Sequence, residues 1–181
     1  MVPMKKLLIL SPYDGFSHGF WREGLAGYLA GEFEITECTL PPRFFSWRQR
    51  GNSLSFGLKP LLQQSFDLMV ATSMTDLSGL RGLNRHLSNV PAIIYFHENQ
   101  LSYPWSPTDR DKQKNRDNHY GFINYSSALS ADKVFFNSVF HMDSFIGHLN
   151  TFLKQFPDHQ EFDTIEEIRE KSEVLYLGID L

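Results

Sequence analysis

Short runs of apolar residues recur along this chain, and most of them end in polar residues or glycine. A continuous apolar run of this kind is typical of a strand that is buried on both faces of a sheet. The second run instead alternates apolar and polar residues and ends at Pro41-Pro42. We therefore predict strands over residues 5–11, 33–40, 66–72, 91–96, 133–138 and 173–179.

Between these runs, apolar residues recur at spacings of three and four, as they do on one face of a helix. This spacing predicts helices over residues 21–29, 75–87, 120–131, 142–156 and 163–171. Thr75 or Asp76 is expected to cap the second helix, and Thr164 with Glu167 has capping-box spacing at the last.

Strands that alternate with helices predict an α/β fold with one doubly wound parallel sheet. Ligands of such sheets bind beyond the carboxyl ends of the strands. Polar clusters follow three predicted strands, at residues 11–19, 97–100 and 137–140. We therefore expect Ser17, His97 and Asn137 to lie at one edge of the sheet and to form a ligand site. The alternative is that His97 and Asn99 only satisfy backbone groups at a strand end.

Composition narrows the classes of protein further. The chain has 181 residues, 41% of them hydrophobic, which is enough for one folded domain with a core. Its single cysteine, Cys38, excludes an internal disulfide, and no apolar run is long enough to span a membrane. The net charge of −4 gives no overall signature of nucleic-acid binding. We expect a cytoplasmic location.

Common site motifs do not fit the polar clusters. His97-Glu98 would begin a zinc-binding H-E-x-x-H motif, but position 101 is leucine. The loop after the first strand lacks the glycine spacing of dinucleotide and P-loop sites. Residues 43–53 interleave arginines with aromatic residues, which suits RNA phosphates and bases; the alternative is a surface loop with its aromatics turned inward. The charged segment 106–118 is interpreted as a solvated loop.

Four stretches together resemble one family: "YFHENQLSYP", "HYGFINYSSALSADKVFFNSVFHMDSF", "TLPPRFFSWRQR" and "FPDH". They are similar to the N-terminal domain of the tRNA-queuosine α-mannosyltransferases. The resemblance implies a GT-B architecture, in which two Rossmann-like domains face each other across a cleft. It also implies transfer of mannose from GDP-mannose, as donor substrate, to queuosine in a tRNA acceptor, with retention of anomeric configuration and without a metal or other cofactor.

The resemblance carries over residue by residue. It implies catalytic roles for His97 and Glu98. It implies substrate binding by the polar residues of the matching motifs, which are Ser17, His18, Asn99, Gln100, Tyr103, Tyr120, Asn124, Asn137 and Ser138. It implies RNA binding by Trp47, Arg48 and Arg50. The chain departs from the family at Phe16, where a second glycine often precedes the Ser-His pair.

The resemblance also predicts how the chain is organised. Residues 1–181 are expected to form a single Rossmann-like, acceptor-side domain, and the segment "VLYLGIDL" to lead toward a C-terminal nucleotide-sugar domain that this chain lacks. Two alternatives remain. One is a GT-B domain for a lipid or glycan acceptor, which a hydrophobic patch beside the cleft would favour over a basic rim. The other is a non-catalytic binding module of the same fold.

Overall fold

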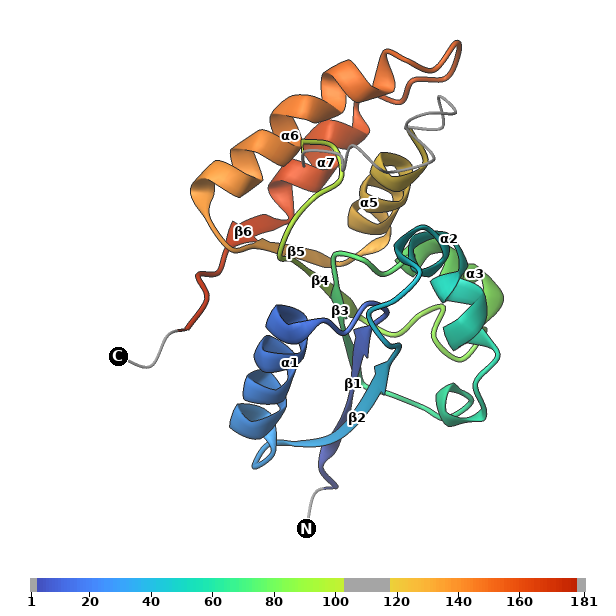
Figure 1. Ribbon diagram of the computed structural model, residues 1–181, viewed down its shortest axis with the longest axis vertical. Helices are drawn as coiled ribbons and strands as arrows, with labels where there is room; N and C mark the ends of the chain where they lie inside the picture. Colours follow the sequence, from blue (N-terminus) through green and yellow to red (C-terminus); the bar gives the residue numbers. More distant parts are fainter. Residues whose placement is uncertain (1–2, 103–117, 179–181) are drawn as a thin grey trace.

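The computed structural model describes residues 3–102 and 118–178, and a parallel sheet of six strands forms the centre of this part (Figure 1). The strands are β1 (Lys5–Ser11), β2 (Phe33–Thr39), β3 (Leu68–Thr72), β4 (Ala92–Phe96), β5 (Lys133–Phe136) and β6 (Ser172–Val174). They lie in the order β2-β1-β3-β4-β5-β6, and every neighbouring pair is parallel. The predicted α/β class, Rossmann-like and doubly wound, is confirmed.

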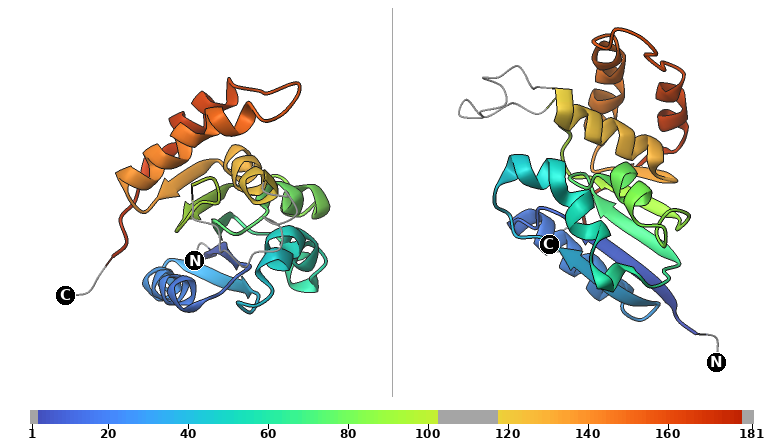
Figure 2. Two further views of the ribbon diagram at one scale, coloured as in Figure 1. Left: turned by 45° about the horizontal axis from the view of Figure 1, so that its top comes forward. Right: turned by 90° about the vertical axis from the view of Figure 1, so that its right-hand side faces the viewer.

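Helices cover both faces of this sheet, as two further views show (Figure 2). They are α1 (Phe16–Leu29), α2 (Phe45–Gly57), α3 (Leu77–Leu83), α5 (Asn118–Ser130), α6 (Val139–Leu153) and α7 (Thr164–Glu170), with the short 3-10 helix η1 (Pro60–Leu62). Helix α1 packs Trp21 and Leu25 on one face, against Leu7 and Ile9 of β1. The larger core lies on the other face, where apolar residues of α2, α3, α5, α6 and α7 gather.

The central strands are buried because both faces are covered. Leu7, Leu8, Ile9 and Leu10 of β1 have no exposed surface, although they point alternately to the two faces. Strand β2 lies at the sheet edge and is only partly buried, which explains its alternating sequence. The long apolar stripe predicted in α6 packs inward through Phe145, with apolar neighbours one and two turns further along the helix.

The alternative of a surface loop at residues 43–53 is wrong, because most of this segment lies in helix α2. The helix has no apolar stripe to reveal it. Its buried positions are mostly polar or glycine, including Gln49, Gly51 and Asn52. Asn52 Nδ2 donates 3.1 Å to the Met74 carbonyl, and its Oδ1 accepts 2.8 Å from the Asp76 amide. The spacing of apolar residues cannot reveal a helix that packs through polar contacts.

Two other local predictions are corrected. The capping box does not form at α7, because the helix begins at Thr164 itself and its hydroxyl donates 2.7 Å to the Glu161 carbonyl. The last strand is only Ser172–Val174, and the chain leaves the sheet after Leu175, with Tyr176 68% exposed. The expected cap of α3 is confirmed for Asp76, whose carboxylate accepts 2.9 Å from the Gly79 amide. Among the described residues, no helix has the length and apolar character to cross a membrane.

Candidate functional site

Four neighbouring strands bring polar residues to one edge of the sheet. The carboxyl ends of β1, β3, β4 and β5 meet there because these strands are parallel and adjacent. The chain runs outward from β1 to β2 on one side and then returns to β3 on the other side of β1, so the strand order reverses between β1 and β3. Doubly wound sheets bind ligands at such a reversal. His18 follows β1, Ser73 follows β3 and Asn137 follows β5. Residues His97 to Ser102, here called the 97–102 turn, follow β4.

The imidazole of His97 lies among three other rings. Its centroid is 4.5 Å from that of His18, 4.7 Å from that of Trp21 and 4.8 Å from that of Tyr95. Burial lowers the pKa of His97 to about 3, and the neighbouring His18 acts in the same direction while Glu98 opposes it. His97 is therefore a neutral imidazole near pH 7, which can donate or accept a hydrogen bond but carries no charge.

Glu98 supplies the negative charge of the site. Ser73 Oγ donates 3.2 Å to Glu98 Oε1, and His18 Nε2 lies 3.4 Å from Glu98 Oε2, a close approach without the alignment of a hydrogen bond. Burial by itself would raise the pKa of Glu98. The contacts with His18, His97 and Ser73 outweigh burial and hold this pKa below its ordinary value. A carboxylate held in this way can accept from ligand hydroxyls and stabilise nearby positive charge.

Three asparagines shape the 97–102 turn. Asn137 Nδ2 donates 2.9 Å to the His97 carbonyl. Asn124, from α5, accepts 2.7 Å from the Gln100 amide and donates 2.9 Å to the Ser73 carbonyl. Asn99 folds back on the turn itself, where its Oδ1 accepts from the backbone amides two and three residues further on, at 3.1 and 3.0 Å. The turn is therefore fixed by side chains from two other elements and by one of its own.

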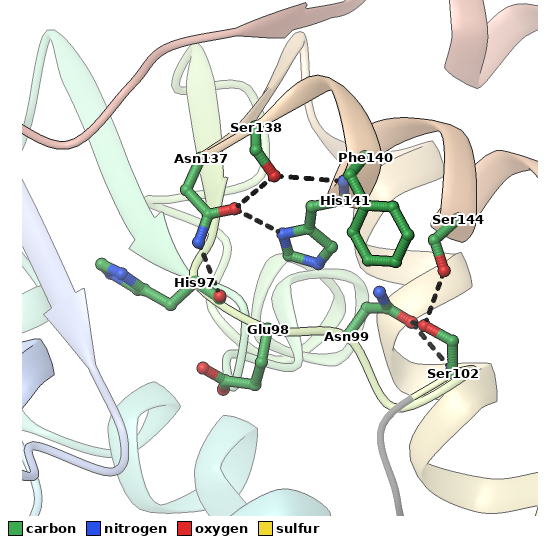
Figure 3. Close-up of a pocket in the computed structure, with 9 residues that line it drawn as sticks. All are labelled: His97, Glu98, Asn99, Ser102, Asn137, Ser138, Phe140, His141 and Ser144. Carbon is green, nitrogen blue, oxygen red and sulfur yellow. Dashed lines mark hydrogen bonds between the residues drawn. The ribbon is translucent and has the colours of Figure 1, made fainter.

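A cavity of about 320 Å³ opens between the 97–102 turn and the start of α6 (Figure 3). Its lining residues are His97, Glu98, Asn99, Ser102, Asn137, Ser138, Phe140, His141 and Ser144. Eight of the nine lining residues have a hydroxyl, amide, imidazole or carboxylate side chain, and the lining includes neither lysine nor arginine among the described residues. The volume is at the lower end of the range for ligand pockets. Such a cavity suits a small ligand rich in hydroxyl groups better than a phosphate.

The structure brings together several of the predicted substrate-binding residues. His18 approaches His97 and Glu98, whereas Ser17, next to it in the first turn of α1, is exposed. Ser138 caps α6 by accepting 3.2 Å from the His141 amide. The expected meeting of the three polar clusters at one edge is thus confirmed, while their contact with substrate stays a prediction.

Other predicted substrate residues are buried or lie elsewhere. Asn124 and Tyr120 are each only 1% exposed on α5. Gln100 lines a second, smaller cavity of about 230 Å³ on the other side of the turn, together with His148. Tyr103 lies outside the described residues.

The predicted RNA-binding residues all lie on α2. Trp47 is 59% exposed. Arg48 Nε donates 3.2 Å to the Pro41 carbonyl at an exposed position. The guanidinium of Arg50 lies over the Tyr120 ring, 4.8 Å from its centroid, and donates 3.3 Å to the Tyr120 hydroxyl. Arg50 therefore links α2 to α5, while Trp47 and Arg48 present the outer surface of the helix.

Two residues of the site were not predicted from the sequence. Ser73, which hydrogen-bonds Glu98, follows β3 directly, and the rule that pointed to the other strand ends would have included it. His141, 8% exposed, lies within one of the stretches that resemble the family, but no role was assigned to it. Its distance of 3.0 Å from Asn137 Oδ1 follows from the turn of α6 above β5. Within residues 3–102 and 118–178, no three histidine, cysteine or acidic side chains are grouped as metal ligands would be.

Fold and site together define a Rossmann-like α/β domain with a small polar cavity at the carboxyl edge of its sheet. Residues 6–179 match the family described as tRNA-queuosine alpha-mannosyltransferase N-terminal. The chain is also 36% identical over 178 residues to a tRNA-queuosine alpha-mannosyltransferase of Drosophila melanogaster. It belongs to this N-terminal family.

The matched region covers 96% of this chain but 45% of the Drosophila melanogaster protein. The chain therefore spans about half the length of the curated relative that it matches.

Proposed function

We propose that this chain is the N-terminal, acceptor-side domain of a GT-B glycosyltransferase that transfers mannose from GDP-mannose to queuosine in tRNA, with retention at the anomeric carbon. The observation that supports this proposal most strongly is the family match over residues 6–179. The polar cavity at the carboxyl edge supports it independently, because the reaction must seat a hydroxyl-rich sugar.

The 97–102 turn is the proposed catalytic segment. A mannosyl transition state develops positive charge at the sugar ring, and the carboxylate of Glu98 provides negative charge inside the cavity. His97 is neutral and partly exposed, so it contacts the donor sugar or the leaving phosphate through a hydrogen bond rather than an ion pair. Gln100 orients hydroxyl groups from the far side of the turn.

The three asparagines have a different role in this proposal. Asn124 and Asn137 use both the donor and the acceptor of their amides within the protein, and Asn99 uses its carbonyl oxygen. We assign them to holding the turn in place. Direct contact with substrate is left to Ser17, His18 and Ser138, with Tyr103 outside the described residues as a further candidate, whereas the buried Tyr120 supports α2 through Arg50.

In this proposal the donor and the acceptor bind to different parts of the protein. GDP-mannose is held mainly by a C-terminal domain, since the matched region covers 45% of the Drosophila melanogaster relative and the described residues that line the cavity include no arginine or lysine for a diphosphate. The tRNA meets α2, where Arg48 contacts phosphate and Trp47 offers a stacking surface for a base. Arg50 supports this surface by joining α2 to α5.

Radiolabelled GDP-mannose tests the proposal with the full-length protein. We expect label to enter tRNA that contains queuosine and not the same tRNA with guanine in place of the modified base. Transfer to a lipid or a glycan but not to tRNA would replace the acceptor, and absence of transfer to any of the three would favour a binding module.

A matched pair of variants tests the role of the site. His97→Ala is expected to lower kcat while tRNA affinity stays nearly unchanged, because His97 lies at the cavity and not on α2. His86→Ala, an exposed histidine in the connection between α3 and β4, is the control and is expected to retain wild-type kcat. Unchanged kcat in His97→Ala would contradict a catalytic role of His97 and leave the 97–102 turn with a structural role only.

A further inference from the structure

One histidine of the site has no place in the proposed function. His141 lies in the first turn of α6 and is 8% exposed. Its ring packs edge-on against that of Phe136, with centroids 5.2 Å apart. Its Nδ1 is 3.0 Å from Asn137 Oδ1, and its Nε2 is buried with no hydrogen-bond partner in the described part of the chain. A buried histidine with one paired and one unpaired nitrogen needs an explanation.

The hydrogen bonds of Asn137 determine where the proton of His141 resides. The His97 carbonyl can only accept, so the Asn137 group that meets it at 2.9 Å must be the amide nitrogen. The amide oxygen then faces His141, with a longer contact of 3.4 Å from the Ser138 hydroxyl, and this oxygen too can only accept. His141 must therefore carry a proton on Nδ1. Figure 3 shows this row from the His97 carbonyl through Asn137 to the imidazole.

Burial keeps this imidazole neutral. The apolar surroundings of His141 lower its pKa from the ordinary value, although Glu98 acts in the opposite direction. A neutral imidazole has one proton, so Nδ1–H leaves a lone pair on Nε2. A proton on Nε2 alone would set two acceptors, Nδ1 and Asn137 Oδ1, against each other at 3.0 Å. Reversing the amide would only move the conflict to the His97 carbonyl, so in that tautomer Asn137 loses one of these two contacts.

Asn137 differs from the other two asparagines that hold the 97–102 turn. Asn124 is held between the Gln100 amide and the Ser73 carbonyl, and these backbone groups have fixed donor and acceptor character. Asn99 likewise accepts from backbone amides. Only at Asn137, among the three, does the orientation of the amide depend on a side chain that can exchange the position of its proton.

We propose that His141 is a positioning residue of the transfer reaction, whose Nδ1 proton orients the Asn137 amide and thereby holds the His97 carbonyl and the 97–102 turn in place. The catalytic part of this inference rests on the proposed function; the arrangement of hydrogen bonds does not. His141 acts through Asn137 and leaves contact with the sugar to the turn itself.

The tautomer is tested by NMR of the full-length protein with ¹⁵N-labelled histidine. We expect His141 to give the signature of a protonated Nδ1 and an unprotonated Nε2, identified by its loss in His141→Asn. In Asn137→Ala this preference for Nδ1–H should be lost, while the signals of His148 stay as in the wild type. A wild-type His141 protonated on Nε2 alone would overturn the proposal, whatever the activity of the protein.

Two substitutions of His141 separate the hydrogen bond from the volume of the ring. His141→Asn places a side-chain amide where Nδ1 lies and keeps a donor for Asn137, whereas His141→Leu fills the space without one. His148→Leu, on the same helix but exposed, is the control. We expect His141→Leu to shift the backbone amide signals of Glu98 and Asn99, and His141→Asn and His148→Leu to leave them close to the wild type.

Kinetics then test the consequence for transfer. We expect His141→Leu to lower kcat roughly 10- to 100-fold through misplacement of the turn, with KM for tRNA little changed, and His141→Asn to recover most of the loss. Equal effects of the two variants on the amide signals would overturn the proposal even if the wild type transfers no mannose. Displaced amide signals without a change in kcat would overturn the catalytic role. Absence of transfer by the wild type, with the tautomer as expected, would instead count against the proposed function.

Discussion

At the scale of single residues, the site combines groups whose charge states are set by burial and by neighbouring side chains. His97 has a pKa lowered from 6.5 to about 3, so the unfolded chain binds a proton near pH 6.5 and the folded chain does not. The stabilisation that this difference represents is complete above pH 6.5 and is lost progressively as the pH falls from 6.5 toward 3. The lowered pKa of His141 has the same effect on stability. The lowered pKa of Glu98 contributes stability that is lost only at lower pH, as the pH falls from 4.5 through the pKa of the folded chain.

We therefore predict that His97 stays neutral in an NMR titration of the folded protein from pH 8 to pH 5. We also predict that His97→Gln flattens the decline in the free energy of unfolding between pH 7.5 and pH 5, because the substitution removes a group that only the unfolded chain protonates in that range. Chemical denaturation at the two pH values measures the slope. A His97 signal that titrates near pH 6.5 would contradict both expectations.

Gly121 is the residue on which the packing of the turn depends most closely. A Cβ at this position would lie 2.7 Å from Leu101 Cδ2 and 3.0 Å from Phe152 Cε2. Gly121→Ala should displace Leu101 and destabilise the fold by about 1–3 kcal/mol, less the gain of up to about 1 kcal/mol from alanine in a helix.

Gly147→Ala on α6 is the matched control, because nothing lies within 4 Å of the added carbon. It should stabilise the fold by up to about 1 kcal/mol through helix propensity alone. Denaturation midpoints of the two variants should move in opposite directions, and a stabilising Gly121→Ala would show that Leu101 yields without cost.

At the scale of elements, a partly buried ion-pair cluster joins α1 to the two strands beneath it. Arg22 of α1 contacts Asp14, after β1, through two hydrogen bonds of 3.1 and 3.0 Å, and it also pairs with Glu37 of β2. Because Arg22 is only 9% exposed, its removal leaves Asp14 uncompensated in a poorly solvated place. Arg22→Met should destabilise the fold by about 1–3 kcal/mol, less than the loss of a fully buried pair.

Arg169→Met gives the comparison on α7, where an exposed arginine lies 3.3 Å from Glu166. This pair should contribute less than about 1 kcal/mol. Chemical denaturation measures both variants. Comparable losses for Arg22→Met and Arg169→Met would mean that the cluster around Arg22 is as well solvated as a surface pair.

Helix α2 is the element assigned to RNA. Arg48→Ala should weaken tRNA binding and reduce the dependence of log K on log salt concentration by roughly one unit, because one phosphate contact no longer releases a counterion. Titrations at several salt concentrations measure the slope, and Arg169→Ala on α7 should leave it unchanged. An unaltered slope in Arg48→Ala would remove this arginine from the RNA surface.

At the scale of the whole molecule, the proposed division of labour separates this domain from the donor. Residues 1–181 alone should bind tRNA weakly and transfer no mannose, because a donor held mainly elsewhere leaves the reacting carbon unpositioned. Transfer assays with the chain alone and with the full-length protein test this directly. Measurable transfer by residues 1–181 would place donor binding in this domain.

The order of strands and helices was predictable because apolar periodicity survives in a sequence wherever an element packs through apolar side chains. β1 and α6 show this, and parallel strands then bring their carboxyl ends to one edge. The meeting of the polar clusters around His97 followed from that rule. The family itself was recognised from motifs that need no geometry.

Only the tertiary structure decided what depends on contacts between distant segments. Helix α2 packs through Asn52 and other polar groups, so its burial leaves no apolar period. The pKa of His97 depends on rings brought from α1 and β4, and the orientation of Asn137 depends on His141 one turn further along the chain. The sequence states which side chains are present. Their burial and their hydrogen-bond partners, which set their charge and orientation, arise only when the strands come together in the fold.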